Sequence, residues 1–239
     1  MRIKVLASGS KGNAYYISDG VSSILLDAGI PLKQIRVGGG FTLSAVCGAF
    51  ITHRHNDHAK AVCDLLSAGV DVYAPSDVFA AKKAAGRHCK PIEDGIVDGK
   101  AQGWIVVGTF RVLPFACHHD VPNLGFYVHS DATGENLVYI TDTYYIEPVF
   151  PDLHYIMAEC NYDPAAIDEN VRAGRIPMQL KARLVKSHMG IDTLLAMLKA
   201  NDLSEVRQIY LLHLSDNNSR AEGFKARVQA VAGCEVVIC

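Results

Sequence analysis

The sequence predicts an α/β protein in which sheets pack on one another and helices cover them on the outside. Two observations support this class: short apolar runs typical of strands fill the first half of the chain and residues 95–160, and helical patterns accompany both blocks. A third observation is that no linker, low-complexity segment or repeat interrupts the 239 residues. We therefore expect one domain over residues 1–239.

The first block begins with strands separated by turn residues. Runs at 3–8, 14–18 and 22–29 are punctuated by glycine-containing turns, as in hairpin-linked strands. A strand over 45–53 precedes a helical pattern over 57–69, which ends at Gly69. A strand over 70–75 and a helix over 76–86, with Ser76 as a possible N-cap, complete this block.

The second block predicts strands over 103–110, 111–117, 124–130, 136–142 and 154–160. The C-terminal part adds a helix over 192–201, a strand over 208–215, a helix over 219–233 and a last strand over 234–239. Strands followed by helices in this way favour sheets with helices packed on their outer faces.

Composition excludes several classes of protein. Hydrophobic content of 49% and a mean hydropathy of +0.13 indicate a well-packed globular chain. The apolar runs are too short to cross a bilayer and the N-terminus resembles a strand without a signal peptide, so we expect a cytoplasmic protein with no membrane partner. Seven cysteines without C-x-x-C spacing argue against a disulfide framework.

Net charge limits any nucleic-acid surface to a local patch. The chain carries a formal charge of −2, which argues against a basic surface throughout. One segment between Val171 and Gly190 has five basic residues and no acidic ones, and could be a solvated face or hold phosphates. These residues are Arg172, Arg175, Lys181, Arg183 and Lys186.

Ligand-type side chains stand at the ends of five predicted strands. A strand end that opens into a loop is where a rigid scaffold presents chemistry. Imidazole and carboxylate suit zinc, manganese or iron, and the set lacks the thiolates of a structural zinc site. The residues at these ends are Asp27, His53, the pair His118 and His119, Asp142, and His213.

The stretch THRHNDH, residues 52–58, carries the densest group. His53 and His55 alternate by two in an extended chain, so both leave on one side. Asp57 and His58 lie at the turn into the next helix and can face a second position. The spacing predicts two sets of ligands, and two adjacent cations need a shared anionic ligand, for which Asp142 is the natural bridging carboxylate.

This stretch resembles the H-x-H-x-D-H signature of the metallo-β-lactamase superfamily. Asp27 in LLDAG, a later His, Asp142 in ITDT and His213 are similar to its other motifs in order and spacing. The resemblance covers nearly the whole chain. It implies an α/β (α+β) four-layer αββα sandwich with a dinuclear site that binds two divalent ions, zinc or manganese, with iron also suited.

The resemblance also implies the role of each residue. Asp27 is expected to orient a ligand imidazole rather than bind metal. In HHD at 118–120, His119 is preferred over His118 because related sequences have a His-Asp pair here. The implied ligands are His53, His55 and His119 for the first ion, Asp57, His58 and His213 for the second, and Asp142 as the bridge.

Within the superfamily, the chain resembles more closely the small bacterial YycJ-type branch, which is DNA exonuclease-like. LASGSKGNAYYI is similar to its S-G-S-x-G-N opening, AECNYD to its E-x-N-H-D segment and LLHLSDNN to its H-L-S region. Tyr162 replaces a His of that branch, and KSHMGI is only similar to its G-H-L-S-N. These departures concern substrate contact rather than the metal site.

The leading hypothesis is a metal-dependent phosphodiesterase, an exonuclease-like enzyme that acts on DNA rather than RNA, or on another phosphodiester, through a metal-bound hydroxide. Asp57 is expected to bind metal and to hold the nucleophile. His188 is a candidate general acid or phosphate contact, although it could equally be an ordinary His at a helix N-terminus. Arg183 and Lys186 are candidates for holding the phosphate backbone.

The loop SGSKGN, residues 8–13, is a tight turn rich in backbone N–H groups. Ser10 and Asn13 are candidates for substrate phosphate, because such turns can bind anions. The loop could equally serve only to position the first hairpin.

Other functions on the same scaffold stay open. A thioesterase of glyoxalase II type or a lactonase is the first alternative, although only a short tail follows His213. A zinc β-lactamase is disfavoured because those exported enzymes have Cys where Asp142 stands, and a diiron oxygen reductase is disfavoured by His55 and by chain length. A non-catalytic metal-binding protein is the alternative from a different class.

Overall fold

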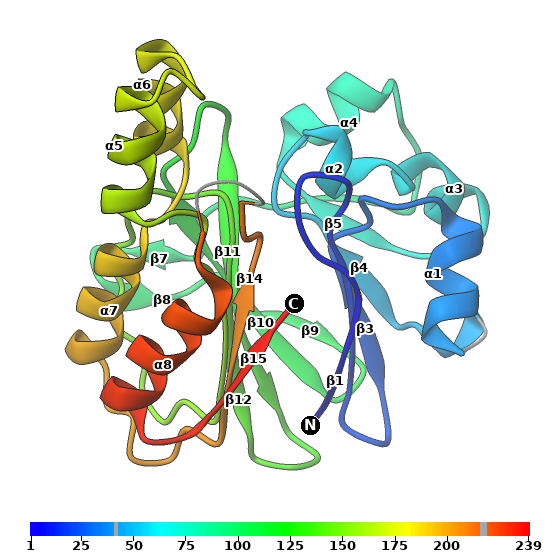
Figure 1. Cartoon of the computed structure of the whole chain (residues 1–239). Coiled ribbons are helices and arrows are strands. Elements are labelled where there is room, and N and C mark those ends of the chain that lie inside the picture. The colour runs from blue at the N-terminus through cyan, green and yellow to red at the C-terminus, as the bar shows by residue number, and fades with distance from the viewer. Residues whose placement is uncertain (41–42, 216–218) are drawn as a thin grey trace. The chain divides into compact units, whose positions relative to one another are not determined.

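The computed structural model describes residues 1–40, 43–215 and 219–239 (Figure 1). The chain divides into two compact units: the first comprises Met1–Ala116 and Val121–Glu135, and the second comprises Cys117–Asp120 and Asn136–Cys239. The expectation of a single domain over residues 1–239 stays a prediction. Within the described ranges, no helix combines the length and the apolar character needed to span a membrane.

A six-stranded sheet forms the centre of the first unit, and its strands follow one another in chain order. The first three strands pair antiparallel, as their turn-rich spacing predicts, and the remaining neighbours pair parallel. Parallel neighbours need crossover connections, which here contain helices. The strands are β1 (Arg2–Ala7), β2 (Ala14–Ser18), β3 (Ser23–Leu26), β4 (Gly48–Phe50), β5 (Val72–Ala74) and β6 (Cys89–Pro91). The helices are α1 (Leu32–Gly39), the 3-10 turn η1 (Leu43–Ala45), α2 (Asn56–Ala59), α3 (Val62–Ser67) and α4 (Ser76–Lys82).

The helices of the first unit cover one face of this sheet. Leu25, Ala49 and Val72 are cross-strand neighbours on β3, β4 and β5, so their side chains form one row. They belong to a single buried cluster with Ile35 of α1 and Leu65 of α3. This apolar layer fixes the ends of β3 and β4, from which candidate site residues follow.

Further strands of the first unit lie against the other face of the sheet. These are β9 (Ile105–Val107), β10 (Phe110–Cys117) and β11 (Asn123–Ser130), with β9 antiparallel to β10. The ring of Phe50 on β4 meets the edge of the Phe126 ring on β11, with centroids 5.5 Å apart. A small separate hairpin consists of β7 (Ile96–Val97) and β8 (Lys100–Ala101).

Asp19, in the turn between β2 and β3, connects the two layers of strands. Its carboxylate accepts hydrogen bonds from the backbone N–H groups of Val21 and Ser22 and from the hydroxyls of Thr109 and Ser130. Burial acts to raise the pKa of Asp19, but these four hydrogen bonds outweigh it and hold the pKa below its ordinary value. The ionised form is therefore part of the folded structure.

The second unit is built on four parallel strands: β12 (Asn136–Ile140), β13 (Tyr155–Glu159), β14 (Gln208–Leu212) and β15 (Glu235–Ile238). Its helices are α5 (Pro164–Arg172), α6 (Met178–Ser187), α7 (Ile191–Ala200) and α8 (Ala221–Ala232). Helices α7 and α8 contact each other, and α8 contacts β15, whereas α5 and α6 form a separate helical pair (Figure 1).

The predicted mixed α/β class is confirmed, and every predicted strand overlaps an observed one. The predicted helix over 57–69 is instead divided into α2 and α3. The division occurs at Ala61, where the backbone N–H donates to the carbonyl of Ala28 at 2.9 Å rather than to the preceding turn. The sequence did not predict α1, β6, α5 or α6. Most residues of α6 are exposed, so the helix lacks a clear apolar face.

Candidate metal centre

The predicted ligands lie directly after strand ends, and three residues there adopt an unusual backbone conformation. Asp27 follows β3, Asp142 follows Thr141 at the end of β12, and His213 follows β14. All three have positive φ, at 57°, 49° and 53° respectively. Non-glycine residues in this region are uncommon and cost about 1–3 kcal/mol each, and they concentrate at functional sites. A residue with positive φ therefore follows each of these three strands.

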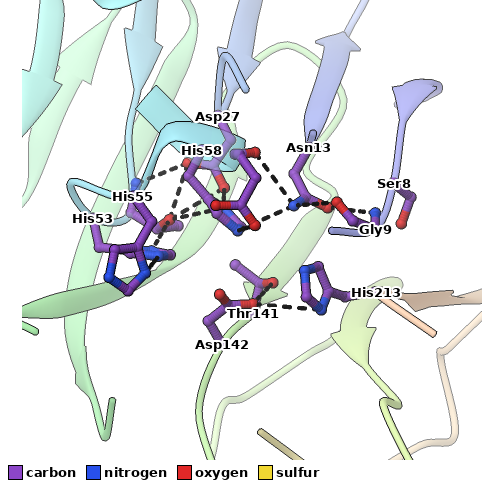
Figure 2. Close-up of polar contacts among 12 residues, drawn as sticks. Ser8, Gly9, Asn13, Asp27, His53, His55, His58, Thr141, Asp142 and His213 are labelled. Carbon is purple, nitrogen blue, oxygen red and sulfur yellow. Dashed lines mark hydrogen bonds and ion pairs between the residues drawn. The ribbon is translucent and has the colours of Figure 1, made fainter. Parts of the chain in front are cut away.

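In the first unit, the chain after β4 brings its histidines together. His53 Nε2 lies 3.1 Å from His55 Nδ1, and the two rings are nearly perpendicular with centroids 4.7 Å apart. Asp57 and His58 lie on α2, with His58 Nε2 at 3.6 Å from Asp57 Oδ2. Within this unit, His53 thus lies beside His55 (Figure 2), and Asp57 lies beside His58.

Asp27 orients His58, as expected for a residue behind a ligand. Its Oδ2 lies 2.7 Å from His58 Nδ1, and its Oδ1 accepts from the backbone N–H and the hydroxyl of Thr52 at 2.8 and 3.0 Å. Because the Thr52 hydroxyl donates to Asp27, it accepts from Nδ1 of His53, 3.0 Å away. Both imidazoles therefore carry the proton on Nδ1 and keep a lone pair on Nε2, the form that binds metal.

The glycine-rich loop before β2 supports α2 from behind. Asn13 is fully buried; its Oδ1 accepts from Gly9 N at 2.9 Å, and its Nδ2 lies 3.0 Å from His58 Nε2 (Figure 2). Its backbone N–H donates to Asp57 O at 2.7 Å, and Gly29 N donates to Asn13 O at 2.7 Å. The amide of Asn13 is thus engaged inside the protein, whereas Ser10 is exposed at the turn.

The backbone of Gly29 packs closely against the backbone of Asp57 and Asn13. A Cβ on Gly29 would lie 1.7 Å from Asp57 O and 2.7 Å from Asn13 N. Any side chain there would displace the backbone that carries Asp57 and His58. The glycine in LLDAG is therefore required by the site itself.

In the second unit, the two oxygens of Asp142 face different imidazoles. Oδ2 lies 3.7 Å from His119 Nε2, and Oδ1 lies 3.7 Å from His213 Nδ1. His119 Nδ1 lies 3.0 Å from the carbonyl of Ser187, to which it donates, so its Nε2 keeps the lone pair. The Asp142 carboxylate thus lies between the imidazoles of His119 and His213.

His118 and His119 differ in burial and in the group that each one faces. His118 Nε2 lies 2.7 Å from Glu147 Oε1 in an exposed pair, whereas the His119 side chain is only 4% exposed and faces Asp142. Burial lowers the pKa of His119, although the carboxylates of Asp142 and Asp120 oppose this effect. A neutral imidazole is the form a metal needs.

Glu159, at the end of β13, is a site residue that the sequence reasoning did not assign. Its fully buried Oε1 lies 2.6 Å from His188 Nδ1 and 3.3 Å from His213 Nδ1, and its Oε2 accepts from the backbone N–H groups of Thr143 and Met189. Ligand-type atoms of Asp142, Glu159, His188 and His213 all lie within 4.8 Å of one another. The signal was present in the sequence, because Glu159 ends an apolar strand just as Asp142 follows one.

Glu159 and His188 fix each other's charge. Burial acts to raise the pKa of Glu159, but the adjacent His188 and the hydrogen bonds from His188 and His213 outweigh it, so the net direction is downward. Burial acts to lower the pKa of His188, yet the charge and hydrogen bond of Glu159 raise it overall. Both shifts favour a carboxylate paired with a protonated imidazole.

The donor set fits divalent cations such as zinc or manganese. The imidazoles of His53, His58 and His119 each have one nitrogen held by an oxygen, which fixes the tautomer and orients the ring. Cys160, the thiol next to Glu159 in sequence, is buried, and burial raises its pKa, so it stays protonated and is no ligand. Nitrogen and oxygen donors without thiolates are typical of catalytic rather than structural sites.

Comparison with known proteins agrees with this chemistry. A family model described as the beta-lactamase superfamily domain matches residues 23–214. The chain belongs to this superfamily. It is 29% identical to exodeoxyribonuclease YycJ of Bacillus anthracis, in an alignment that covers 97% of this chain and 89% of the relative. It is 27% identical to exodeoxyribonuclease WalJ of Streptococcus pneumoniae, in an alignment that covers 92% of this chain and 84% of that relative. The metallo-β-lactamase fold protein YhfI of Bacillus subtilis aligns with a TM-score of 0.69 at 17% identity, covering 99% of this chain and 95% of that one.

Membership of the beta-lactamase superfamily confirms the predicted fold and the predicted class of enzyme, a metal-dependent hydrolase. The predicted resemblance to the YycJ-type branch is likewise confirmed. At 17% identity, the structural likeness to YhfI concerns the fold alone.

Fewer of the five basic residues between Val171 and Gly190 are available to bind phosphate than the sequence indicates. Arg175 contacts Glu169 and Asn170, and Lys181 pairs with Asp168, so the acidic residues of α5 engage part of it. Arg172 Nε also donates to the carbonyl of Asp168. Arg183 and Lys186, the two residues predicted to contact phosphate, are exposed on α6.

Proposed function

We propose that this chain is a dinuclear phosphodiesterase that hydrolyses DNA in an exonuclease-like manner. The observation that carries the proposal is Asp142, whose two oxygens each face a different imidazole at 3.7 Å. A bridging carboxylate of this kind is what two adjacent divalent cations require. The exodeoxyribonuclease relatives, which align over most of this chain, support DNA as the substrate.

The proposed ligands follow the superfamily resemblance. His53, His55 and His119 hold the first ion, Asp57, His58 and His213 hold the second, and Asp142 is shared. Zinc or manganese is the proposed metal, and iron also suits these donors. When bound, the cations supply a water of lowered pKa and positive charge beside the attacked phosphorus.

Asp57 has a second role in the proposed reaction. Its backbone is fixed by Asn13 N at 2.7 Å, and its side chain is about a quarter exposed, at 26%. An ionised carboxylate in this position accepts a hydrogen bond from the attacking water and aligns it for attack. Asp27 and Thr52 do not bind metal themselves. They hold His58 and His53, respectively, in the tautomers that bind metal.

His188 is the proposed proton donor to the leaving oxygen. Its Nδ1 is occupied by Glu159 at 2.6 Å, so the other ring nitrogen, Nε2, is the one that donates. Glu159 raises the pKa of His188 and so favours its protonated form, which a general acid needs. Glu159 is a positioning residue, because it acts through His188.

Substrate binding is proposed to use the two exposed cations of α6. Arg183 and Lys186 lie one turn apart, and α6 ends next to His188. Lys and Arg bind phosphates without regard to base sequence, which suits an exonuclease that must accept any sequence. Ser10 is proposed to contact phosphate at the glycine-rich turn. A cytoplasmic location is part of the same proposal.

The test is metal-dependent hydrolysis of bis(p-nitrophenyl) phosphate and of single-stranded, duplex and 5′-phosphorylated oligonucleotides of DNA and RNA. We expect turnover with Mn²⁺ or Zn²⁺, preference for DNA, and a loss of about 100-fold or more in Asp57→Ala. Asp64→Ala is the matched control, because Asp64 is exposed on α3. Turnover of a thioester or lactone without turnover of any phosphodiester would favour the glyoxalase II-type alternative and overturn the proposal.

A further inference from the structure

Two large aromatic side chains lie exposed immediately after the proposed bridging ligand. Tyr144 is 43% exposed and Tyr145 is 50% exposed, two and three residues beyond Asp142. Ile146 and Phe150 of the same segment are buried, at 5% and 4% exposure, whereas Val149 is exposed. The segment is therefore anchored by Ile146 and Phe150 while it presents its tyrosines to solvent.

The backbone that carries these tyrosines is held by several hydrogen bonds. Thr143 N donates to Glu159 Oε2 at 3.2 Å, and the Thr143 hydroxyl donates to Tyr145 O at 2.6 Å and accepts from His118 N at 2.9 Å. Tyr144 N donates to His118 O at 3.3 Å. A ligand that packs on Tyr144 would therefore meet a surface that is already ordered, which lowers the entropic cost of binding.

Tyr144 is also supported through its ring. Its centroid lies 5.3 Å from that of His118, with the planes inclined by 30°, and Glu147 Oε1 holds His118 Nε2 at 2.7 Å. We call these three residues, Tyr144, His118 and Glu147, the Tyr144 platform. His118 directly precedes the proposed ligand His119, so the platform is linked by short stretches of backbone to two proposed metal ligands.

The charge of the platform decides what kind of group it accepts. The platform presents the exposed ring of Tyr144, and its His118 is held by Glu147 at 2.7 Å, so these three residues offer a phosphate no unpaired cation. A nucleobase is neutral, planar and aromatic, and stacking on tyrosine contributes about 1–3 kcal/mol per base without selecting its sequence. A single exposed tyrosine needs no explanation, but one whose ring lies beside the His118 ring, on a hydrogen-bonded backbone close in sequence to proposed metal ligands, is suited to a base.

We propose that Tyr144, backed by the His118 ring, stacks on the base of the nucleotide next to the cleaved phosphodiester bond. This inference rests on the proposed function and adds a base-binding position to it. It explains how a site that reads no sequence can still prefer nucleotides to simple phosphodiesters. The base is held by its face, so the four bases are accepted alike.

The kinetic test compares two diesters that differ in the base. Thymidine 5′-(p-nitrophenyl phosphate) has one, and methyl p-nitrophenyl phosphate has none. Tyr144→Ala is expected to raise KM for the thymidine ester about tenfold, with the methyl ester unchanged, and Tyr144→Trp to restore the wild-type value. Tyr145→Ala, in the same segment but outside the platform, is the matched control and is expected to leave both substrates unchanged.

A binding measurement separates this inference from the proposed activity. Fluorescence anisotropy with an internally labelled, cleavage-resistant phosphorothioate oligonucleotide compares ends that carry bases with ends that are abasic. Wild type is expected to bind the intact ends about tenfold more tightly, and Tyr144→Ala to bind both equally. If binding depends on the base in this way but no phosphodiester is hydrolysed, the phosphodiesterase proposal is wrong and the platform is retained. Equal affinity of wild type for both oligonucleotides, or an equal effect of Tyr145→Ala, would overturn the platform.

Discussion

Glu159 Oε1 accepts a hydrogen bond from His188 Nδ1 at 2.6 Å, inside the second unit, and the carboxylate is fully buried. The same oxygen lies 3.3 Å from His213 Nδ1. One anion thus orients both a proposed metal ligand and the proposed proton donor. A buried carboxylate with two such partners is costly to remove, because each imidazole would lose the group that fixes its tautomer.

Replacement of Glu159 by Gln is expected to lower kcat on a phosphodiester by about 10–100-fold, with a smaller effect on KM. The amide keeps the shape of the side chain but no longer holds His188 in its protonated form. Steady-state kinetics on bis(p-nitrophenyl) phosphate measures this, with circular dichroism to establish folding. Glu205→Gln, at an exposed turn, is the control. A folded Glu159→Gln enzyme with wild-type kcat would contradict the positioning role.

Thr52 offers a matched pair of substitutions behind the first histidine. Thr52→Val removes the hydroxyl that links Asp27 to His53 while keeping the shape, whereas Thr52→Ser keeps the hydroxyl. We expect the Val variant to bind Zn²⁺ or Mn²⁺ about tenfold more weakly or worse, and the Ser variant to bind nearly as wild type. Isothermal titration of the metal-stripped protein measures both. Equal affinities for the two variants would show that the hydroxyl does not orient the site.

Gly29→Ala is expected to be strongly destabilising. The added Cβ would lie 1.7 Å from the carbonyl oxygen of Asp57, so the backbone of α2 must move. Forced overpacking costs about 3 kcal/mol or more, which lowers the melting temperature by roughly 6 °C or more. Gly38→Ala is the control, because its Cβ would meet only Leu6 Cδ2, at 3.6 Å, within helix α1. Thermal denaturation that ranks the two variants in the opposite order would refute the assigned packing.

Asp19 gives a prediction of pH dependence away from the metal centre. Its folded pKa is lowered, so its contribution to stability is fully present above the unfolded pKa and is lost as pH falls through the folded value. Asp19→Asn is expected to lower the free energy of unfolding by about 1–3 kcal/mol at neutral pH, with the difference from wild type shrinking below about pH 4.

Urea denaturation from pH 3 to 7 measures this difference, with the exposed Asp64→Asn as the control. A difference between wild type and Asp19→Asn that stays constant down to pH 3 would show that ionisation of Asp19 does not contribute.

Most of the proposed site could be predicted from the sequence, because its ligand types stand at strand ends, where apolar runs stop abruptly. The sequence paired His53 with His55 correctly, because alternation in an extended chain is a local property. It missed the roles of Thr52 and Glu159, because a hydroxyl or carboxylate that acts through a neighbour depends on contacts between distant segments. Helices α1, α5 and α6 were missed for another reason: they bury few side chains, so the spacing of apolar residues carries little signal.

The direct test of the dinuclear phosphodiesterase is activity as a function of metal bound per chain. Metal-stripped protein is titrated with Mn²⁺ or Zn²⁺, bound metal is counted by inductively coupled plasma mass spectrometry, and hydrolysis of a DNA oligonucleotide is followed at each point. The account predicts two ions per chain at saturation and activity that rises only as the second one binds. Full activity with one ion per chain, or two ions with no hydrolysis of any phosphodiester, would contradict it.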